Sequence, residues 1–464
     1  MNLKLAAIIF FATVLRISAL NNHDFWFDEA FTYQIAKLPL KELLSAVLSD
    51  NNPPLYYLIM HYVLKFGQNE IILRLPSILF SIATIPLVFT ITKKLINQKV
   101  ANLSVLLFSI SPLSIYISTE ARLHSLTTFI LAAIIATFFY LLENPNLKTI
   151  IAFILFLILG LYTQYYIALL LIPFTLFIIQ KKSVLSLKKW VRIASVPTLF
   201  LLPWLAVSTQ VNHALCWCPN TLLSLPASLV APAIAGVGIV TMRSFTGLPL
   251  PLIALFLTAS TVILMLFIKG LIKENPFSKI YITLILIVSM LGLFLPVFSP
   301  KGFTIFLPIY LMITAIGINS IKLKKTVTTA LLLLLGIIVL VQINNPFFRG
   351  ERIKDAYILT KENLSAPIYH TSLVTYYSFD FYSQEQQKNI LLTPSPLNTT
   401  ITKFIGGEKK SLDDTSPQTF WLVDTNKWAP SAERDNVLSS INSNYQKYQS
   451  KTIDHVTVAL FKQK

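Results

Sequence analysis

Long apolar stretches separated by short polar loops run through the first three quarters of the chain. Each is close to the roughly 20 residues that a helix needs to cross a bilayer. They lie near 3–21, 75–96, 101–118, 125–142, 149–165, 166–180, 193–209, 249–268, 280–297, 303–320 and 326–342. The pattern predicts a polytopic α-helical membrane protein with about 11 transmembrane helices, which form one domain over residues 1–342.

Two further apolar stretches, 53–66 and 222–240, lie in longer loops and are interrupted by proline. Irregular or broken backbone at membrane depth is tolerated only where protein or a water-filled cavity covers it. We therefore expect both stretches to be interfacial or re-entrant pieces rather than full crossings.

The composition agrees with a membrane protein. Hydrophobic residues make up 54% of 464 positions and charged residues 13%, and the mean hydropathy is +0.65. The first apolar stretch is longer than the core of a usual signal peptide and no small-residue cleavage site follows it, so we expect it to stay in the mature chain. The net charge of +17 comes from short basic runs between apolar stretches, which orient membrane helices rather than bind nucleic acid.

The basic residues also predict the orientation. With the N-terminus in the cytoplasm, sixteen fall inside: Lys4, Lys93, Lys94, Lys99, Lys148, Lys181, Lys182, Lys188, Lys189, Arg192, Lys269, Lys273, Lys279, Lys322, Lys324 and Lys325. Seven fall outside: Lys37, Lys41, Lys65, Arg74, Arg122, Arg243 and Lys301. The positive-inside rule favours this orientation in the cell membrane.

The composition becomes polar from about residue 343. Short β-like runs occur at 366–369, 420–423 and 456–460, with a helix-like stretch at 434–448. Residues 343–464 are therefore predicted to form a small α/β domain with its own core. An odd number of spans places this domain outside the cytoplasm.

Two adjacent carboxylates, Asp28 and Glu29, stand among aromatic residues at the start of a long outer loop over 22–74. A carboxylate at a membrane face is costly unless water, a cation or a substrate meets it. We interpret Asp28 as the catalytic base of a membrane enzyme, and expect the side chain of Glu29 to point in a different direction. The alternative is that one of the two acids caps a short helix beginning at Ala30.

A second polar stretch, 118–126, joins two spans through an outer turn that contains Glu120, Arg122 and His124. A guanidinium suits bidentate recognition of phosphate. Arg122 is therefore a candidate phosphate ligand, with a local ion pair that pins the turn as the alternative.

These stretches resemble the membrane glycosyltransferases of the C superfamily, most closely the protein O-mannosyltransferase-like group. The motifs are Asp28-Glu29-Ala30, then Asn52-Pro53-Pro54-Leu55-Tyr56-Tyr57 followed by Leu73-Arg74-Leu75-Pro76, then Ser118-Thr119-Glu120-Ala121-Arg122. The resemblance implies transfer of a hexose or pentose from a polyprenyl-phosphate carrier to a lipid, polysaccharide or protein acceptor on the outer face.

The resemblance also implies roles for particular residues. Asp28 matches the general base and Glu29 its partner in the acidic pair. The implied substrate-binding residues are Tyr56, Arg74, Glu120, Arg122, His124 and Lys301. Relatives often carry an Arg-Tyr pair near position 301, where this chain has Lys301-Gly302-Phe303, and a histidine where this chain has Gln164.

The chemistry of such a transfer needs few groups. One carboxylate accepts the proton of the acceptor hydroxyl, and cations stabilise the phosphate leaving group, so a single displacement should invert the anomeric centre. A divalent metal beside the acidic pair is compatible with this chemistry, but no ligand set is identifiable, and Cys216 and Cys218 lack zinc spacing. We predict no cofactor. The main alternative function is a transporter or flippase of lipid-linked sugars.

Overall fold

The structure is a computed structural model of the whole chain. It describes residues 3–21, 23–180, 185–208, 249–292, 304–344, 352–393, 399–412, 417–425 and 431–464. The stretch 222–240, the cysteines Cys216 and Cys218, and the candidate ligand Lys301 lie outside the described residues, so their predictions stay untested.

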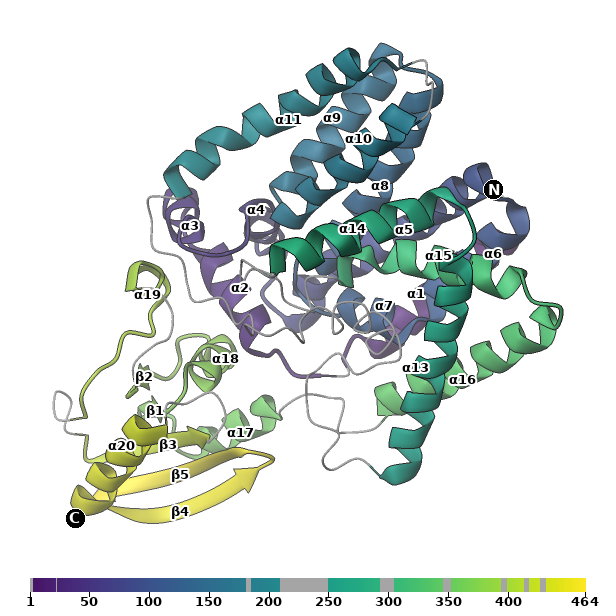
Figure 1. Cartoon of the computed structure of the whole chain (residues 1–464). Helices are drawn as coiled ribbons and strands as arrows, with labels where there is room; N and C mark the ends of the chain where they lie inside the picture. The colour runs from purple at the N-terminus through teal and green to yellow at the C-terminus, as the bar shows by residue number, and fades with distance from the viewer. Residues whose placement is uncertain are drawn as a thin grey trace.

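A bundle of apolar helices forms the larger part of the molecule (Figure 1). Its elements are α1 (Leu3–Ala19), α5 (Glu70–Leu95), α6 (Gln98–Ile110), α7 (Pro112–Ser118), α8 (His124–Glu143), α9 (Leu147–Leu161), η1 (Tyr165–Leu170), α10 (Leu171–Gln180), α11 (Leu187–Ser208), α13 (Leu250–Leu271), α14 (Pro276–Gly292), α15 (Leu307–Asn319) and α16 (Lys324–Asn344). Each of the predicted spans coincides with one of these helices or with a consecutive pair. The predicted multi-pass helical fold is confirmed.

Length and composition qualify five helices of the described part as membrane spans, or six if the bent pair α6 and α7 counts as one. The other predicted spans correspond to shorter apolar helices such as α9 and α14. The number of eleven therefore stays a prediction.

Asparagine side chains begin several of the membrane helices. The side chains of Asn69, Asn97 and Asn146 accept hydrogen bonds from the third backbone N–H of α5, α6 and α9 respectively, at 2.9–3.0 Å. Such caps satisfy amide groups that a helix cannot pair internally. These three asparagines thus mark where the chain starts its next helix.

Glycine allows two of the helices to cross closely. A Cβ atom added to Gly270 of α13 would lie 1.9 Å from the backbone oxygen of Ile313 in α15. A Cβ added to Gly317 of α15 would lie as close to the backbone oxygen of Leu266 in α13. Small residues at both sides of a crossing are typical of membrane helix packing.

The first helix carries a buried cation that the hydropathy pattern did not reveal. Arg16 donates to the side chains of Ser81 (2.9 Å) and Ser114 (2.8 Å) and to the backbone oxygen of Ser109 (3.2 Å). Ion-dipole contacts of this kind offset the cost of a charge at membrane depth. The hydrogen bonds of Arg16 therefore hold α1 against α5 and against the break between α6 and α7.

Three short helices fill the predicted outer loop between α1 and α5. They are α2 (Phe27–Lys37), α3 (Leu40–Val47) and α4 (Leu55–Val63). At 1.5 Å per residue, α4 is about 14 Å long, too short to cross a bilayer, as predicted for the stretch 53–66. The helix α2 lies between the membrane helices and the C-terminal part (Figure 1).

The C-terminal part is a mixed sheet with helices on both faces, which confirms the predicted small α/β domain. Its elements are α17 (Ile353–Thr360), η4 (Lys361–Asn363), β1 (Ile368–His370), α18 (Leu373–Ser383), β2 (Asn389–Leu391), α19 (Thr399–Ile405), β3 (Thr419–Thr425), α20 (Ser431–Asn444), β4 (Tyr445–Ile453) and β5 (Val456–Gln463). The strand order is β2-β1-β3-β5-β4, in which β1 pairs parallel with β2 and β3 while β5 pairs antiparallel with β3 and β4. The start of this domain at residue 343 stays a prediction.

Successive side chains of β3 point to opposite faces of the sheet, and helices cover both faces. Trp421 and Val423 pack with α17 and α18, whereas Phe420 and Leu422 pack in the core that α20 covers. A strand whose side chains are buried on both faces reads as a continuous apolar run. This is why the run 420–423 was recognisable as a strand.

The expected helix over 434–448 is wrong at its C-terminal end. The helix α20 ends at Asn444, and β4 follows from Tyr445 as an edge strand paired with β5. Most β4 side chains are polar and exposed, so the segment lacks the apolar pattern of a buried strand. Pairing with β5, rather than local propensity, decides its structure.

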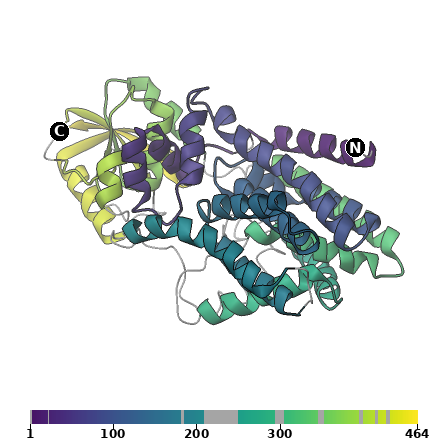
Figure 2. The same ribbon diagram turned by 90° about the horizontal axis from the view of Figure 1, so that it is seen from above.

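The sheet domain lies against the outer loop (Figure 2), where α18 packs on α2. The ring of Phe381 stacks on Phe25 with centroids 4.0 Å apart and meets Tyr33 edge-on at 5.0 Å. Gln34 donates a 2.6 Å hydrogen bond to Asp380, and Lys37 pairs with Glu385. The contact buries one face of α2, the helix that begins with the acidic pair.

Candidate active site

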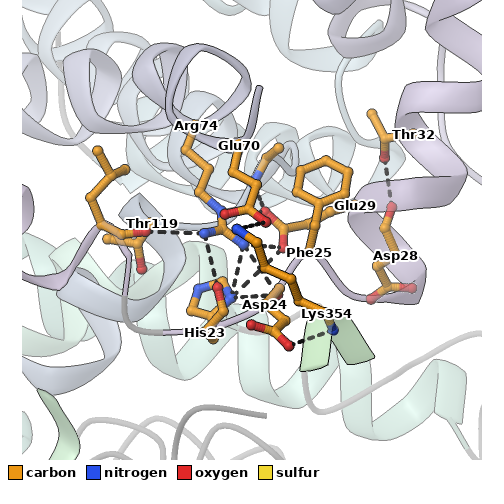
Figure 3. Close-up of polar contacts among 12 residues, drawn as sticks. His23, Asp24, Phe25, Asp28, Glu29, Thr32, Glu70, Arg74, Thr119 and Lys354 are labelled. Atoms are coloured by element: carbon orange, nitrogen blue, oxygen red, sulfur yellow. Dashed lines mark hydrogen bonds and ion pairs between the residues drawn. The ribbon is translucent and has the colours of Figure 1, made fainter. Parts of the chain in front are cut away.

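Asp28 and Glu29 lie in the first turn of α2, where carboxylates favour the helix dipole. The helix begins at Phe27 and its N-cap residue is Trp26, which makes no side-chain capping bond. The alternative in which an acid caps a helix from Ala30 is therefore wrong. Figure 3 shows the two carboxylates turned to different sides, as expected from their adjacency.

Glu29 is fully buried in an ion pair with Arg74. Its Oε1 atom accepts from Arg74 Nε at 2.9 Å and its Oε2 atom from Arg74 Nη2 at 2.8 Å. The backbone N–H of Ala121 donates to the same carboxylate at 2.7 Å. Burial alone would raise the pKa of Glu29, but the Arg74 guanidinium brings it below its usual value, so the carboxylate stays charged.

The remaining N–H groups of Arg74 donate hydrogen bonds to the segment that precedes α2. It donates to the backbone oxygens of Leu20 (3.0 Å), His23 (3.1 Å) and Asp24 (3.2 Å), and to His23 Nδ1 at 3.1 Å (Figure 3). Burial and the neighbouring Arg74 lower the pKa of His23 to about 4, so its ring is neutral and can accept. The contacts of Glu29 and Arg74 join α2, α5 and the turn before α8. Their assigned catalytic and substrate-binding roles stay predictions.

Arg122 reaches from that turn to α2. Its Nη1 atom donates to the backbone oxygen of Asp28 at 3.1 Å and to Thr32 Oγ1 at 2.8 Å. Burial alone would lower the pKa of Arg122, but Asp28, Tyr57, Asp50 and Glu120 together raise it. The guanidinium is thus a fixed cation beside Asp28. These contacts also brace the loop, so the bracing alternative stays open.

A second carboxylate near Arg122 escaped the sequence analysis. Asp50 is buried and accepts from the Tyr57 hydroxyl at 2.6 Å and from the Asn52 side chain at 3.1 Å. Burial and Asp50 raise the pKa of Tyr57 well above its usual value, so the phenol stays protonated and donates. The signal that could have revealed Asp50 was its place two residues before Asn52-Pro53-Pro54 in the predicted outer loop.

The other candidates lie around the same cluster. Tyr56 is buried with its hydroxyl 3.4 Å from Ser77 Oγ, and Ser77 in turn donates to the backbone oxygen of Arg122 at 3.3 Å. Glu120 is fully buried and acts electrostatically on Tyr56 and Arg122. His124 is buried at the first position of α8. The structure brings together seven of the eight predicted site residues; the eighth, Lys301, is not among those described.

No group of three or more His, Cys, Asp and Glu side chains that could hold a metal ion occurs in the described ranges. The carboxylate of Glu29 instead pairs with a guanidinium and a backbone N–H group, and that of Asp50 with a phenol. The prediction of no cofactor remains a prediction.

Comparison with known proteins gives one family match and several similar solved structures. Residues 51–207 match the family of dolichyl-phosphate-mannose-protein mannosyltransferases. The search of curated proteins gives no match. Among solved structures, ArnT from Cupriavidus metallidurans in the apo state is similar with a TM-score of 0.62 at 11% identity, over 98% of this chain and 97% of that one. The same protein bound to undecaprenyl phosphate gives a TM-score of 0.61 at 12% identity over the same shares of both chains.

An archaeal enzyme shares the architecture as well. The oligosaccharyltransferase from Archaeoglobus fulgidus, tethered to an acceptor peptide containing the NVT sequon, has a TM-score of 0.52 at 12% identity, over 98% of this chain and 74% of that one. At such identities the likeness defines the fold. The chain has the fold of the membrane glycosyltransferases of the C superfamily, and the predicted mannosyltransferase-like resemblance is confirmed. Family match and fold together indicate a multi-pass membrane glycosyltransferase.

Proposed function

We propose that this protein transfers a sugar from a polyprenyl-phosphate carrier to an acceptor hydroxyl on the outer face of the membrane. The observation that carries the proposal is the position of the fixed cation Arg122 beside Asp28, which is half-buried at the start of α2. The similar fold of ArnT in its complex with undecaprenyl phosphate supports a lipid-phosphate donor. The acceptor is a lipid, polysaccharide or protein.

In the proposed mechanism Asp28 accepts the proton of the acceptor hydroxyl as its oxygen attacks the anomeric carbon. The bond between that carbon and the carrier phosphate breaks, and the electron pair stays on the phosphate. Arg122 stabilises the charge that develops there. Because one displacement occurs at the anomeric carbon, the product has inverted configuration. Glu29 and Arg74 position Asp28 by fixing the chain on both sides of it.

The chain orientation belongs to the same proposal, because a carrier-linked donor is needed only where cytosolic nucleotide sugars are absent. We expect the N-terminus inside and the C-terminal domain outside. After replacement of Cys216 and Cys218 by serine, single cysteines at the exposed positions Lys188 and Leu323 should be labelled from the cytoplasm. Cysteines at the exposed positions Lys41 and Leu364 should be labelled from outside. Labelling of position 364 from the cytoplasm would contradict the odd number of spans.

Transfer by protein purified in detergent tests the function and separates it from a flippase. The assay supplies a radiolabelled polyprenyl-phosphate sugar and a membrane extract as the acceptor source. An enzyme should move label into a product without a membrane to cross. A flippase needs two compartments and should leave the label on the carrier, and that result would contradict the proposal.

A further inference from the structure

A cavity of about 370 Å³ opens at the end of the membrane bundle away from Arg122. It lies where α6, α15 and α16 pack together (Figure 1). The lining groups are Lys99 of α6, Asn319 of α15, Lys324 and Lys325 of α16, and two threonines of α16, with Leu103 and Ile318 on the apolar side. Its volume falls within the roughly 300–1,000 Å³ of small-molecule sites.

The polar lining of this pocket consists of three lysines, one asparagine and two threonines, and it contains no carboxylate. Within the part of the chain that the structure describes, Lys99, Lys324 and Lys325 form no ion pair. Other lysines of the same bundle differ: Lys94 pairs with Glu143 at 2.6 Å and Lys279 with Glu274 at 2.9 Å. The pocket therefore concentrates positive charge that nearby acids do not neutralise.

The pocket also lies at the ends of three membrane helices. Lys99 is in the first turn of α6, Asn319 ends α15, and Lys324 begins α16. Leu103 is one helical turn farther along α6, about 6 Å deeper into the bundle. The first turn of α16 contains no acidic residue, so its free N–H groups and its dipole add to the attraction for an anion.

We propose that this pocket binds the phosphate headgroup of an anionic phospholipid. The three ammonium groups and the start of α16 would hold the phosphodiester, while Leu103 and Ile318 meet the first carbons of the acyl chains. Basic pockets between membrane helices are suited to such headgroups. The site is separate from the Asp28 cluster and does not rest on the proposed function.

Native mass spectrometry of the full chain in detergent tests the site by titration with phosphatidylglycerol and, as a zwitterionic control, phosphatidylcholine. The wild-type protein should retain one phosphatidylglycerol and little phosphatidylcholine. The triple variant K99Q/K324Q/K325Q should bind phosphatidylglycerol about 100-fold more weakly, since each lysine near an anionic lipid contributes a factor of about five. The matched variant K93Q/K269Q/K273Q loses the same charge at exposed lysines that do not line the pocket and should bind as the wild type does.

A third variant, K99R/K324R/K325R, keeps the charge and should keep binding, and thermal melting of all variants monitors their folding. Equal loss of binding in both glutamine variants would overturn the proposal, because general surface charge would then explain the affinity. Displacement of phosphatidylglycerol by inorganic phosphate at equal concentration would also overturn it, since the pocket would then take the free anion rather than the lipid.

Discussion

Asp28→Asn should lower sugar transfer by about 100- to 10,000-fold, the range that one positioned acid–base group contributes. The amide has nearly the same volume as the carboxylate, and the substitution keeps the backbone oxygen of Asp28, which accepts hydrogen bonds from Thr32 and Arg122. Folding and insertion should therefore survive. The measurement is turnover per folded molecule in detergent, with thermal melting alongside.

Glu29→Gln is the matched control, because it neutralises the adjacent carboxylate. Glu29 is buried with Arg74, and loss of one partner of such a pair destabilises a protein by about 3–5 kcal/mol. We expect a lower melting temperature, with turnover of the surviving folded protein reduced less than in Asp28→Asn. The reverse order of turnover would assign the base to Glu29, and wild-type turnover by well-folded Asp28→Asn would remove Asp28 from the mechanism.

Arg122→Ala should cost about 2–4 kcal/mol of transition-state stabilisation, or about 30- to 1,000-fold in rate, if its guanidinium holds the donor phosphate. Arg122→Lys should retain part of the activity, because the charge survives while the bidentate geometry is lost. Both rates are measured per folded molecule with saturating carrier-linked donor.

Thr32→Val separates the phosphate role from loop bracing. It removes the hydroxyl that accepts from Arg122 Nη1 but leaves the guanidinium in place. Bracing predicts that Thr32→Val and Arg122→Ala both lower stability while turnover per folded molecule stays near normal. A phosphate role predicts that Arg122→Ala alone loses turnover heavily.

The helices and the gathering of candidates on one face followed from the sequence because both depend on local pattern. Apolar runs of span length predict helices regardless of their neighbours, and alternate spans bring their loops to the same side. This is why Asp28 and Arg122, 94 residues apart, could be expected together before their contact was known. The strand β3 was recognisable for the same reason, since its apolar run needs no partner to be noticed.

Features that depend on pairing across the chain were not predictable. The partner of Glu29 is Arg74, 45 residues away, and only the tertiary fold that brings the start of α2 to α5 selects it over other cations. Little in the sequence distinguished Asp50 from an ordinary loop residue, because its hydrogen bond with Tyr57 and its interaction with Arg122 arise only in the folded chain. The first residues of the polar edge strand β4 were expected to continue the helix, because only pairing with β5 makes this segment a strand. In each case the information lies in tertiary contacts rather than in periodicity.

A structure of this protein with bound polyprenyl phosphate tests the central claim most directly, namely that sugar transfer occurs between Asp28 and Arg122. We predict that the phosphate oxygens lie within about 3 Å of the Arg122 guanidinium, as in charge-assisted hydrogen bonds. The Asp28 carboxylate should face the position where the sugar would begin. A phosphate held elsewhere, with Arg122 still bonded to Thr32 and to the backbone of Asp28, would contradict the account.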